Sequence, residues 1–155
     1  MFETIAWATD GSELADRALD HVRLLAEIHG SRIVAVHANE LLTGRASGAP
    51  SLADERDIWE KLRGQVTELR ADGFDARLEI RSGTESVAVL VNRAAEDVEA
   101  DLIVVGTHGR GVVTAALMGS VARSLCHASG RPLLVVPPPG GVERSSDEAG
   151  RLIEA

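Results

Sequence analysis

The sequence predicts a doubly wound α/β fold, in which a five-stranded parallel sheet is sandwiched between helices. Five short apolar runs alternate along the chain with longer segments whose apolar residues recur every three or four positions. Glycines and polar turn residues separate these segments. Strands that are separated by helices pair in parallel, and their crossovers place helices on both faces of the sheet. The chain of 155 residues is long enough for one such domain with a substantial core.

The first strand is expected at residues 5–9 and the second at residues 32–38, each as a short apolar run that is buried on both faces. Apolar residues at helical spacing predict a helix between them. Asp10 and Glu13 have the spacing of a capping box at the start of this helix, and Ser12 is a competing N-cap.

The middle of the chain predicts a long loop, two helices and an edge strand. Residues 39–53 contain glycine, proline and small polar residues, as long loops do. Residues 54–71 have one apolar face and are expected to form a helix. Residues 74–80 alternate apolar and polar side chains, which predicts a strand with one solvated face at the edge of the sheet. Residues 82–85 offer cap chemistry for a third helix at 87–98.

The last part of the chain repeats the alternation once more. A buried strand is expected at residues 101–105, a helix at 121–128 and a final strand at 133–136. Three consecutive prolines and two glycines then end the regular structure. The expected organisation is one domain at residues 1–139 and a flexible C-terminal tail at 140–155.

Composition narrows the classes of function. The chain is 45% hydrophobic and 26% charged, as globular domains are. Its formal net charge of −8 and its aromatic content of 3% argue against nucleic acid or an anionic membrane as a partner. No apolar run approaches the ~20 residues of a membrane span, and the first residues lack the basic and apolar regions of a signal peptide. We therefore expect a cytoplasmic protein.

A glycine-rich segment after the fourth predicted strand has the order of elements that binds phosphate. The sequence Gly-Thr-His-Gly at residues 106–109 is followed, after nine residues, by Gly119 and Ser120 at the start of a helix. Glycines let the backbone approach a ligand, and a helix N-terminus presents free amides to an anion. Arg110 is the one fixed cation of this loop, and His108 is a further donor. The segment is neither a Walker A loop nor a G-x-G-x-x-G fingerprint.

The position of this loop in the fold suggests what lies beside it. In a doubly wound sheet, ligands bind at the carboxyl ends of the strands where the strand order reverses. In a five-stranded sheet that point lies beside the first strand. The ends of the first two strands, at Asp10 and Ala38, would therefore meet the loop of residues 106–120.

Several of these residues also have a structural interpretation. Ser120 could cap its helix, and Asp10 could cap the first helix as readily as it could bind the hydroxyls of a ribose. His37 is expected to be a histidine with satisfied hydrogen bonds, Cys126 a small buried side chain and Trp7 a core residue. No cluster of His, Cys or carboxylates has recognisable metal spacing.

Together these segments resemble the universal stress protein family. The resemblance rests on Ala-Thr-Asp-Gly-Ser at 8–12, Val-His-Ala at 36–38, the run at 100–110, Gly-Ser-Val-Ala at 119–122 and Arg-Pro-Leu-Leu-Val-Val at 131–136. It implies a Rossmann-like fold of the adenine nucleotide alpha hydrolase type. Members that bind ATP have G-x-x-G, nine residues and then G-[ST], and this chain is similar to that subgroup.

The resemblance implies ATP, AMP or ADP as the ligand, with Mg²⁺ as a companion of the triphosphate. Asp10 would face the ribose, the backbone near Ala38 would face the adenine, and the glycine loop would surround the phosphates. The implied binding residues are Ala8, Thr9, Asp10, Ala38, Val105, Gly106, His108, Gly109, Arg110, Gly119, Ser120 and Val121.

The family also commonly dimerises by pairing last strands across a two-fold axis, which here means a homodimer through residues 133–136. Two departures from the family stand out. Ala122 occupies a position where a hydroxyl residue often follows the Ser-Val pair, and Trp7 is bulkier than the usual aliphatic residue, so it either crowds the crevice or repacks the core.

The leading hypothesis is therefore a small dimeric, nucleotide-dependent regulator of the stress response. One alternative is a slow ATPase, although the sequence shows no general base beside the loop. Another is a dimeric interaction module that uses no nucleotide. The protein partners are unknown.

Overall fold

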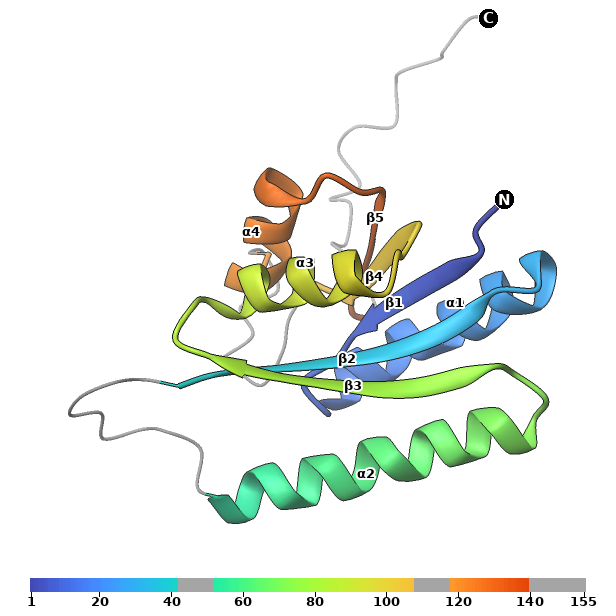
Figure 1. Cartoon of the computed structure of the whole chain (residues 1–155), viewed down its shortest axis with the longest axis horizontal. Coiled ribbons are helices and arrows are strands. Elements are labelled where there is room, and N and C mark those ends of the chain that lie inside the picture. Colours follow the sequence, from blue (N-terminus) through green and yellow to red (C-terminus); the bar gives the residue numbers. More distant parts are fainter. Residues whose placement is uncertain (42–51, 108–117, 140–155) are drawn as a thin grey trace, which may run out of the picture.

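Five parallel strands form one sheet in the order β3-β2-β1-β4-β5 (Figure 1). The structure is a computed structural model that describes residues 1–41, 52–107 and 118–139. Its elements are β1 (Thr4–Ala8), α1 (Glu13–His29), β2 (Arg32–Glu40), α2 (Leu52–Ala71), β3 (Ala76–Gly83), α3 (Val87–Asp97), β4 (Leu102–Gly106), α4 (Ser120–Ala128) and β5 (Leu133–Val136). The predicted doubly wound fold class is confirmed.

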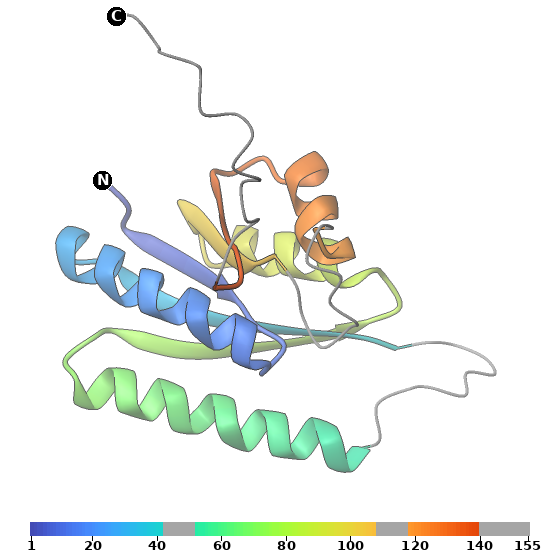
Figure 2. The same cartoon turned by 180° about the vertical axis from the view of Figure 1, so that it is seen from behind.

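The sheet is the middle layer of three. Helices α1 and α2 cover one face, and α3 and α4 cover the other (Figures 1 and 2). Successive side chains of a strand point to opposite faces, so Ile5 and Trp7 of β1 join the core beneath α1 and α2. Ala6 and Ala8 join the core beneath α3 and α4.

Trp7 is the largest fully buried side chain and lies beneath α1. Its indole N–H donates to the carbonyl oxygen of Ala15 at 3.0 Å, so the one polar atom of the buried ring has a hydrogen-bond partner. The prediction that Trp7 is a core residue is confirmed. Its side chain faces α1 and α2 and fills the core on that side of the sheet. It therefore does not crowd the opposite side, which Ala8 faces.

The structure decides between the two predicted caps of α1 and corrects the predicted cap of α3. Ser12 is the N-cap of α1, and its hydroxyl accepts from the amide of Ala15, whereas Asp10 instead accepts from the amide of Ser12. Ser86, and not a residue of 82–85, is the N-cap of α3. The reason is that β3 continues to Gly83, because β2 offers it pairing partners as far as Glu40.

The position of β3 at the edge of the sheet is as predicted. Its alternation reflects two different layers: Ala76 and Leu78 pack toward α2, whereas Glu79 and Arg81 form an ion pair beside α3, where Arg81 also meets Asp97. The edge strand is thus covered by charged and apolar side chains on opposite faces.

The expectation that Cys126 is buried is wrong, because Cys126 is exposed on α4. The buried residues of α4 are Ala122 and Leu125, and Cys126 lies outside this narrow stripe. The flexible tail predicted at residues 140–155 lies outside the described residues. Within the described part of the chain, no helix has both the length and the apolar composition of a membrane span.

Candidate functional site

The strand order reverses beside β1, and the helices that follow β1 and β4 lie on opposite faces of the sheet. Ala8 pairs with Val36 of β2 on one side and with Val105 of β4 on the other. The chain continues from β1 into α1 on one face, and from β4 toward α4 on the other (Figure 2). In doubly wound sheets the ligand site lies at such a point, which here is at the carboxyl ends of β1, β2 and β4.

Four of the predicted site residues come together in the core beneath α3 and α4. Ala8 and Val105 are buried members of this cluster, and Ala38 and Val121 are partly buried against it. They come from β1, β4, β2 and α4. The structure therefore brings together small apolar side chains from four elements, at the carboxyl ends of the strands.

The turn after β1 places Thr9 and Asp10 beside this cluster. The amide of Thr9 donates to the carbonyl of Val36 at 2.9 Å, and the Thr9 hydroxyl accepts from the amide of Gly11 at 3.1 Å. Asp10 Oδ1 accepts from the amide of Ser12 at 3.0 Å, while the Asp10 side chain remains partly exposed. Asp10 thus has a structural role in the turn without being the helix cap.

Gly11 shows why this turn needs a glycine. Its φ of +77° is unfavourable for residues with a side chain, and an added Cβ would lie 3.1 Å from Ile58 of α2. The turn is therefore fixed both by its own hydrogen bonds and by the packing of α2 against it.

The described ends of the glycine-rich loop are joined to each other. The amide of Thr107 donates to the carbonyl of Val136, and the amide of Gly119 donates to the carbonyl of Thr107 at 2.7 Å. The loop therefore starts at the end of β4 and returns beside it at the start of α4. His108, Gly109 and Arg110 lie outside the described residues.

Helix α4 begins without a side-chain cap. Its N-cap is Gly119, with a φ of −58°, which has no side chain to accept a hydrogen bond from the first amides of the helix. Positive φ angles among the described glycines occur at Gly11, Gly30 and Gly73, so the backbone conformation at Gly119 does not itself require a glycine. Ser120 follows as an exposed first residue. Uncapped first-turn amides at a helix N-terminus are ordinary partners for an anion.

Arg123 adds a cation to this helix end, although it is not among the residues predicted from the sequence. The guanidinium donates to the carbonyl of Met118 at 3.1 Å, next to Gly119. The first turn of α4 contains no acidic residue, whereas the first turn of α1 contains Glu13 and Asp16. A cation at a helix N-terminus adds to the positive potential of the helix dipole there, which makes this end more attractive to an anion. In the sequence, Arg123 could have been found from its spacing, because a residue three positions after Ser120 lies on the same side of the helix.

His37 is confirmed as a histidine with satisfied hydrogen bonds. It is 2% exposed, with Nδ1 at 2.9 Å from the carbonyl oxygen of Thr9 and Nε2 at 3.1 Å from Oε2 of Glu55. Glu55 was not singled out by its sequence, because only the fold places the start of α2 above the end of β2. Among the described residues, no group of three or more His, Cys, Asp or Glu side chains could hold a metal ion.

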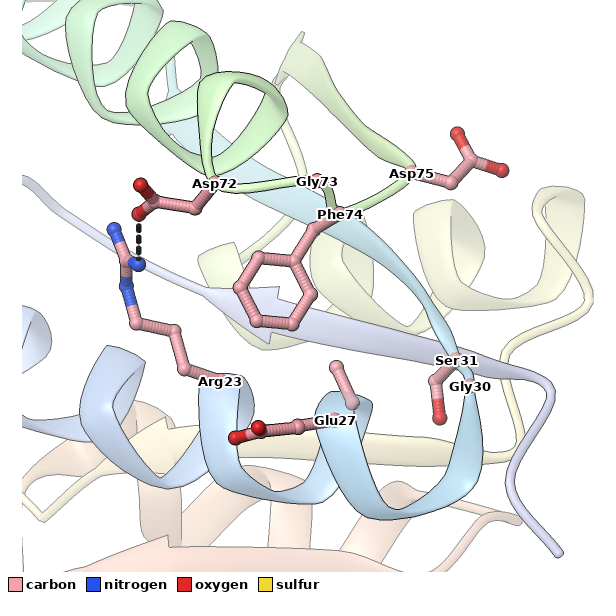
Figure 3. A pocket seen from close by; sticks show the side chains of 9 residues that line it. Arg23, Glu27, Gly30, Ser31, Asp72, Gly73, Phe74 and Asp75 are labelled. Atoms are coloured by element: carbon pink, nitrogen blue, oxygen red, sulfur yellow. Dashed lines mark hydrogen bonds and ion pairs between the residues drawn. The ribbon is translucent and has the colours of Figure 1, made fainter.

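A separate hollow of about 720 Å³ lies at the opposite edge of the sheet (Figure 3). It is lined by residues between the end of α1 and the turn before β3, among them Arg23, Ser31 and Phe74. Arg23 forms an ion pair with Asp72 at 2.5 Å and lies over the Phe74 ring. Ser31 and Phe74 precede β2 and β3, so this hollow is at the amino ends of the strands and is distinct from the predicted site.

Comparisons with known proteins agree with this architecture. A universal stress protein from Thermus aquaticus is 33% identical over 139 residues, which cover 88% of this chain and 99% of the relative. The solved structure of MJ0577, a universal stress protein from Methanocaldococcus jannaschii, superposes with a TM-score of 0.72 at 25% identity, covering 91% of this chain and 99% of that one. The universal stress protein of Archaeoglobus fulgidus in complex with dAMP has the same fold, with a TM-score of 0.65 at 23% identity over 88% of this chain and 98% of that one.

The family model of the universal stress proteins matches residues 1–137, which contain every strand and helix of the structure. The relative from Thermus aquaticus is matched over nearly its whole length. The family match and this relative show that the chain belongs to the universal stress protein family.

Proposed function

We propose that the chain binds an adenine nucleotide at the carboxyl edge of the sheet, with the phosphates at the N-terminus of α4. The observation that supports this most strongly is the start of α4, where Gly119 leaves the first amides uncapped and Arg123 adds positive charge. A phosphate placed there would accept from backbone amides and gain from the helix dipole.

The nucleoside would lie across the small apolar side chains at the ends of β1, β2 and β4. Ala8, Ala38 and Val105 present little bulk there, and the partly exposed Asp10 is one residue beyond Thr9 at the end of β1. A carboxylate in this position suits the hydroxyls of a ribose. The backbone near Ala38 would contact the adenine.

Relatives of the same fold support the class of ligand. The Archaeoglobus fulgidus protein was crystallised with dAMP, an adenine nucleotide. For this chain we propose ATP as the principal ligand, with ADP and AMP as competitors, because the G-x-x-G, nine-residue, G-S pattern is complete. His108, Gly109 and Arg110 would complete the surroundings of the phosphates. Mg²⁺ would accompany the triphosphate, with phosphate oxygens and water as most of its ligands.

A homodimer through β5 is the second part of the proposal. The amide of Ile103 donates to the carbonyl of Pro132, and the amide of Thr107 donates to that of Val136. Alternate residues of a strand direct their backbone groups to opposite sides, so Leu133 and Val135 direct theirs away from β4 to the free edge. A second β5 would satisfy these groups and cover the apolar strand. The dimer would act as a nucleotide-dependent regulator in the stress response.

Substitution of Gly119 tests the proposed phosphate site with a matched pair of variants. Gly119→Asp and Gly119→Asn both supply a side-chain cap to α4, so both should leave the fold intact and raise its stability by at most a few tenths of a kcal/mol. Only the aspartate adds a negative charge where the phosphate would bind. We expect Gly119→Asp to weaken ATP binding in calorimetric titrations by about tenfold or more relative to Gly119→Asn.

Two outcomes would contradict the proposal. One is wild-type protein that shows no saturable binding at millimolar ATP. The other is equal ATP affinity for the two Gly119 variants, which would place the phosphates away from α4.

A further inference from the structure

His37 links the turn after β1 to helix α2 through two hydrogen bonds. Nδ1 lies 2.9 Å from the carbonyl oxygen of Thr9, and Nε2 lies 3.1 Å from Oε2 of Glu55. Both side chains are buried, with 2% of His37 and 7% of Glu55 exposed. The link therefore runs through the interior, from the predicted nucleotide site to the start of α2.

The chemistry of the two partners fixes where hydrogens must lie. A carbonyl oxygen only accepts, so Nδ1 of His37 must donate to Thr9. Nε2 faces a carboxyl oxygen, so a second hydrogen must lie between Nε2 and Glu55, bound either to the imidazole or to the carboxyl group. In either case Nδ1 of His37 donates a hydrogen bond to the carbonyl oxygen of Thr9.

This donor gives Thr9 a third hydrogen bond. The Thr9 amide donates to Val36, and its hydroxyl accepts from Gly11. With His37 on its carbonyl oxygen, the peptide group between Thr9 and Asp10 has a fixed orientation. That peptide determines where Asp10 is presented.

Helix α2 contacts the same turn at two further points, from residues on one side of the helix. Ile58 packs against Gly11, where an added Cβ would lie 3.1 Å from its Cγ2. Lys61 Nζ donates to the Gly11 carbonyl at 2.6 Å and also meets Asp16 of α1. Glu55, Ile58 and Lys61 are three residues apart, so a single face of α2 supports the turn after β1.

We propose that His37 and Glu55 are positioning residues of the nucleotide site. The pair holds the Thr9 carbonyl and so orients Asp10 toward the nucleotide, without touching the nucleotide itself. This inference rests on the proposed nucleotide binding and adds to it the means by which α2 controls the ribose side of the site.

Three substitutions separate the two hydrogen bonds of His37. His37→Asn keeps an amide donor at the position of Nδ1, and so keeps the bond to Thr9. His37→Gln places its amide nearer to Glu55 and leaves the Thr9 carbonyl without its donor. Glu55→Gln keeps a hydrogen-bonding group against Nε2 but cannot carry a charge.

We expect His37→Gln to raise the dissociation constant for ATP by about tenfold, because the Thr9 carbonyl is released. His37→Asn and Glu55→Gln should stay within about threefold of the wild type. Titrations are made well below the melting temperature of each variant, so that only folded protein is compared. A purely structural role would lower the melting temperatures and leave the dissociation constants equal.

Glu55→Ala provides a second test if His37→Gln fails to fold. It removes the outer support of His37 at the start of α2, and we expect weaker ATP binding than in Glu55→Gln. Wild-type protein that does not bind ATP would refute the proposed function itself. Wild-type binding that is matched by Glu55→Ala, and by His37→Gln where that variant folds, would overturn the positioning role and leave the proposed function standing.

Discussion

Asp101 ties the start of β1 to the start of β4. Its Oδ2 accepts from the amides of Glu3 at 2.7 Å and of Thr4 at 2.9 Å. These hydrogen bonds, from Thr4 first and Glu3 second, hold the pKa of the Asp101 carboxyl below its ordinary value. One exposed side chain thus aligns two central strands at the edge opposite to the proposed nucleotide site.

The lowered pKa of Asp101 gives its contribution to stability a direction in pH. The charged form is favoured in the folded state, so the stabilisation is complete above the unfolded pKa of about 4 and is lost as pH falls through the folded pKa. We expect Asp101→Asn to lower the melting temperature by a few degrees at pH 7. The difference from the wild type should shrink toward pH 3, as followed by circular dichroism.

Asp20→Asn on the exposed face of α1 makes the same change of charge without touching these two amides. A deficit of Asp101→Asn that is the same at pH 7 and pH 3, or one that Asp20→Asn reproduces, would contradict this account.

At the scale of single residues, the sequence predicted which residues of the candidate site lie at strand ends better than it predicted which side chains are hydrogen-bonded to one another. Ala8, Ala38 and Val105 could be placed together because strand ends align in a parallel sheet. The pairing of His37 with Glu55 could not, because it depends on which turn of α2 lies over β2. The contact of Arg123 with Met118 depends on the same kind of information about α4.

At the scale of elements, two helix caps that look alike in the sequence differ in the structure. Ser12 accepts from the amide of Ala15, whereas Ser86 makes no side-chain hydrogen bond at the start of α3. The strands differ from prediction where pairing is decided at long range. β3 extends to Gly83 because it meets Glu40, and local sequence does not show that contact.

The two serines provide a matched prediction. Ser12→Ala should destabilise the fold by about 1 kcal/mol, because one first-turn amide of α1 loses its acceptor. Ser86→Ala should change the stability by less than about 0.5 kcal/mol. Urea denaturation of both variants measures the difference, and equal losses would show that the cap geometry at Ser12 has no energetic effect.

At the scale of the whole molecule, the fold class was predictable from the alternation of strands and helices, and the edge position of β3 from its alternating side chains. Right-handed crossovers leave few other ways to bury both faces of five apolar strands. Assembly depends on a second copy of the chain. The backbone groups that could pair with that copy lie on the side of β5 that faces away from β4.

Val135→Pro tests assembly through β5. Proline removes an amide that points away from β4, so the pairing of β4 with β5 should persist while pairing across the dimer is lost. We expect sedimentation analysis to show a shift from the dimer toward the 16.4 kDa chain, with Val135→Ala as a dimeric control. A monomeric wild type, or a Val135→Pro protein that remains dimeric, would contradict this interface.

The most direct test of the proposed site is a titration of isotopically labelled protein with ATP, followed through its backbone amide resonances. We expect saturable shifts that are largest at the start of α4, from Gly119 to Ala122, with further shifts at Thr9, Asp10 and Ala38. Saturable shifts centred instead on Phe74 and the hollow at the opposite edge of the sheet, or no saturable shift at millimolar ATP, would contradict the account.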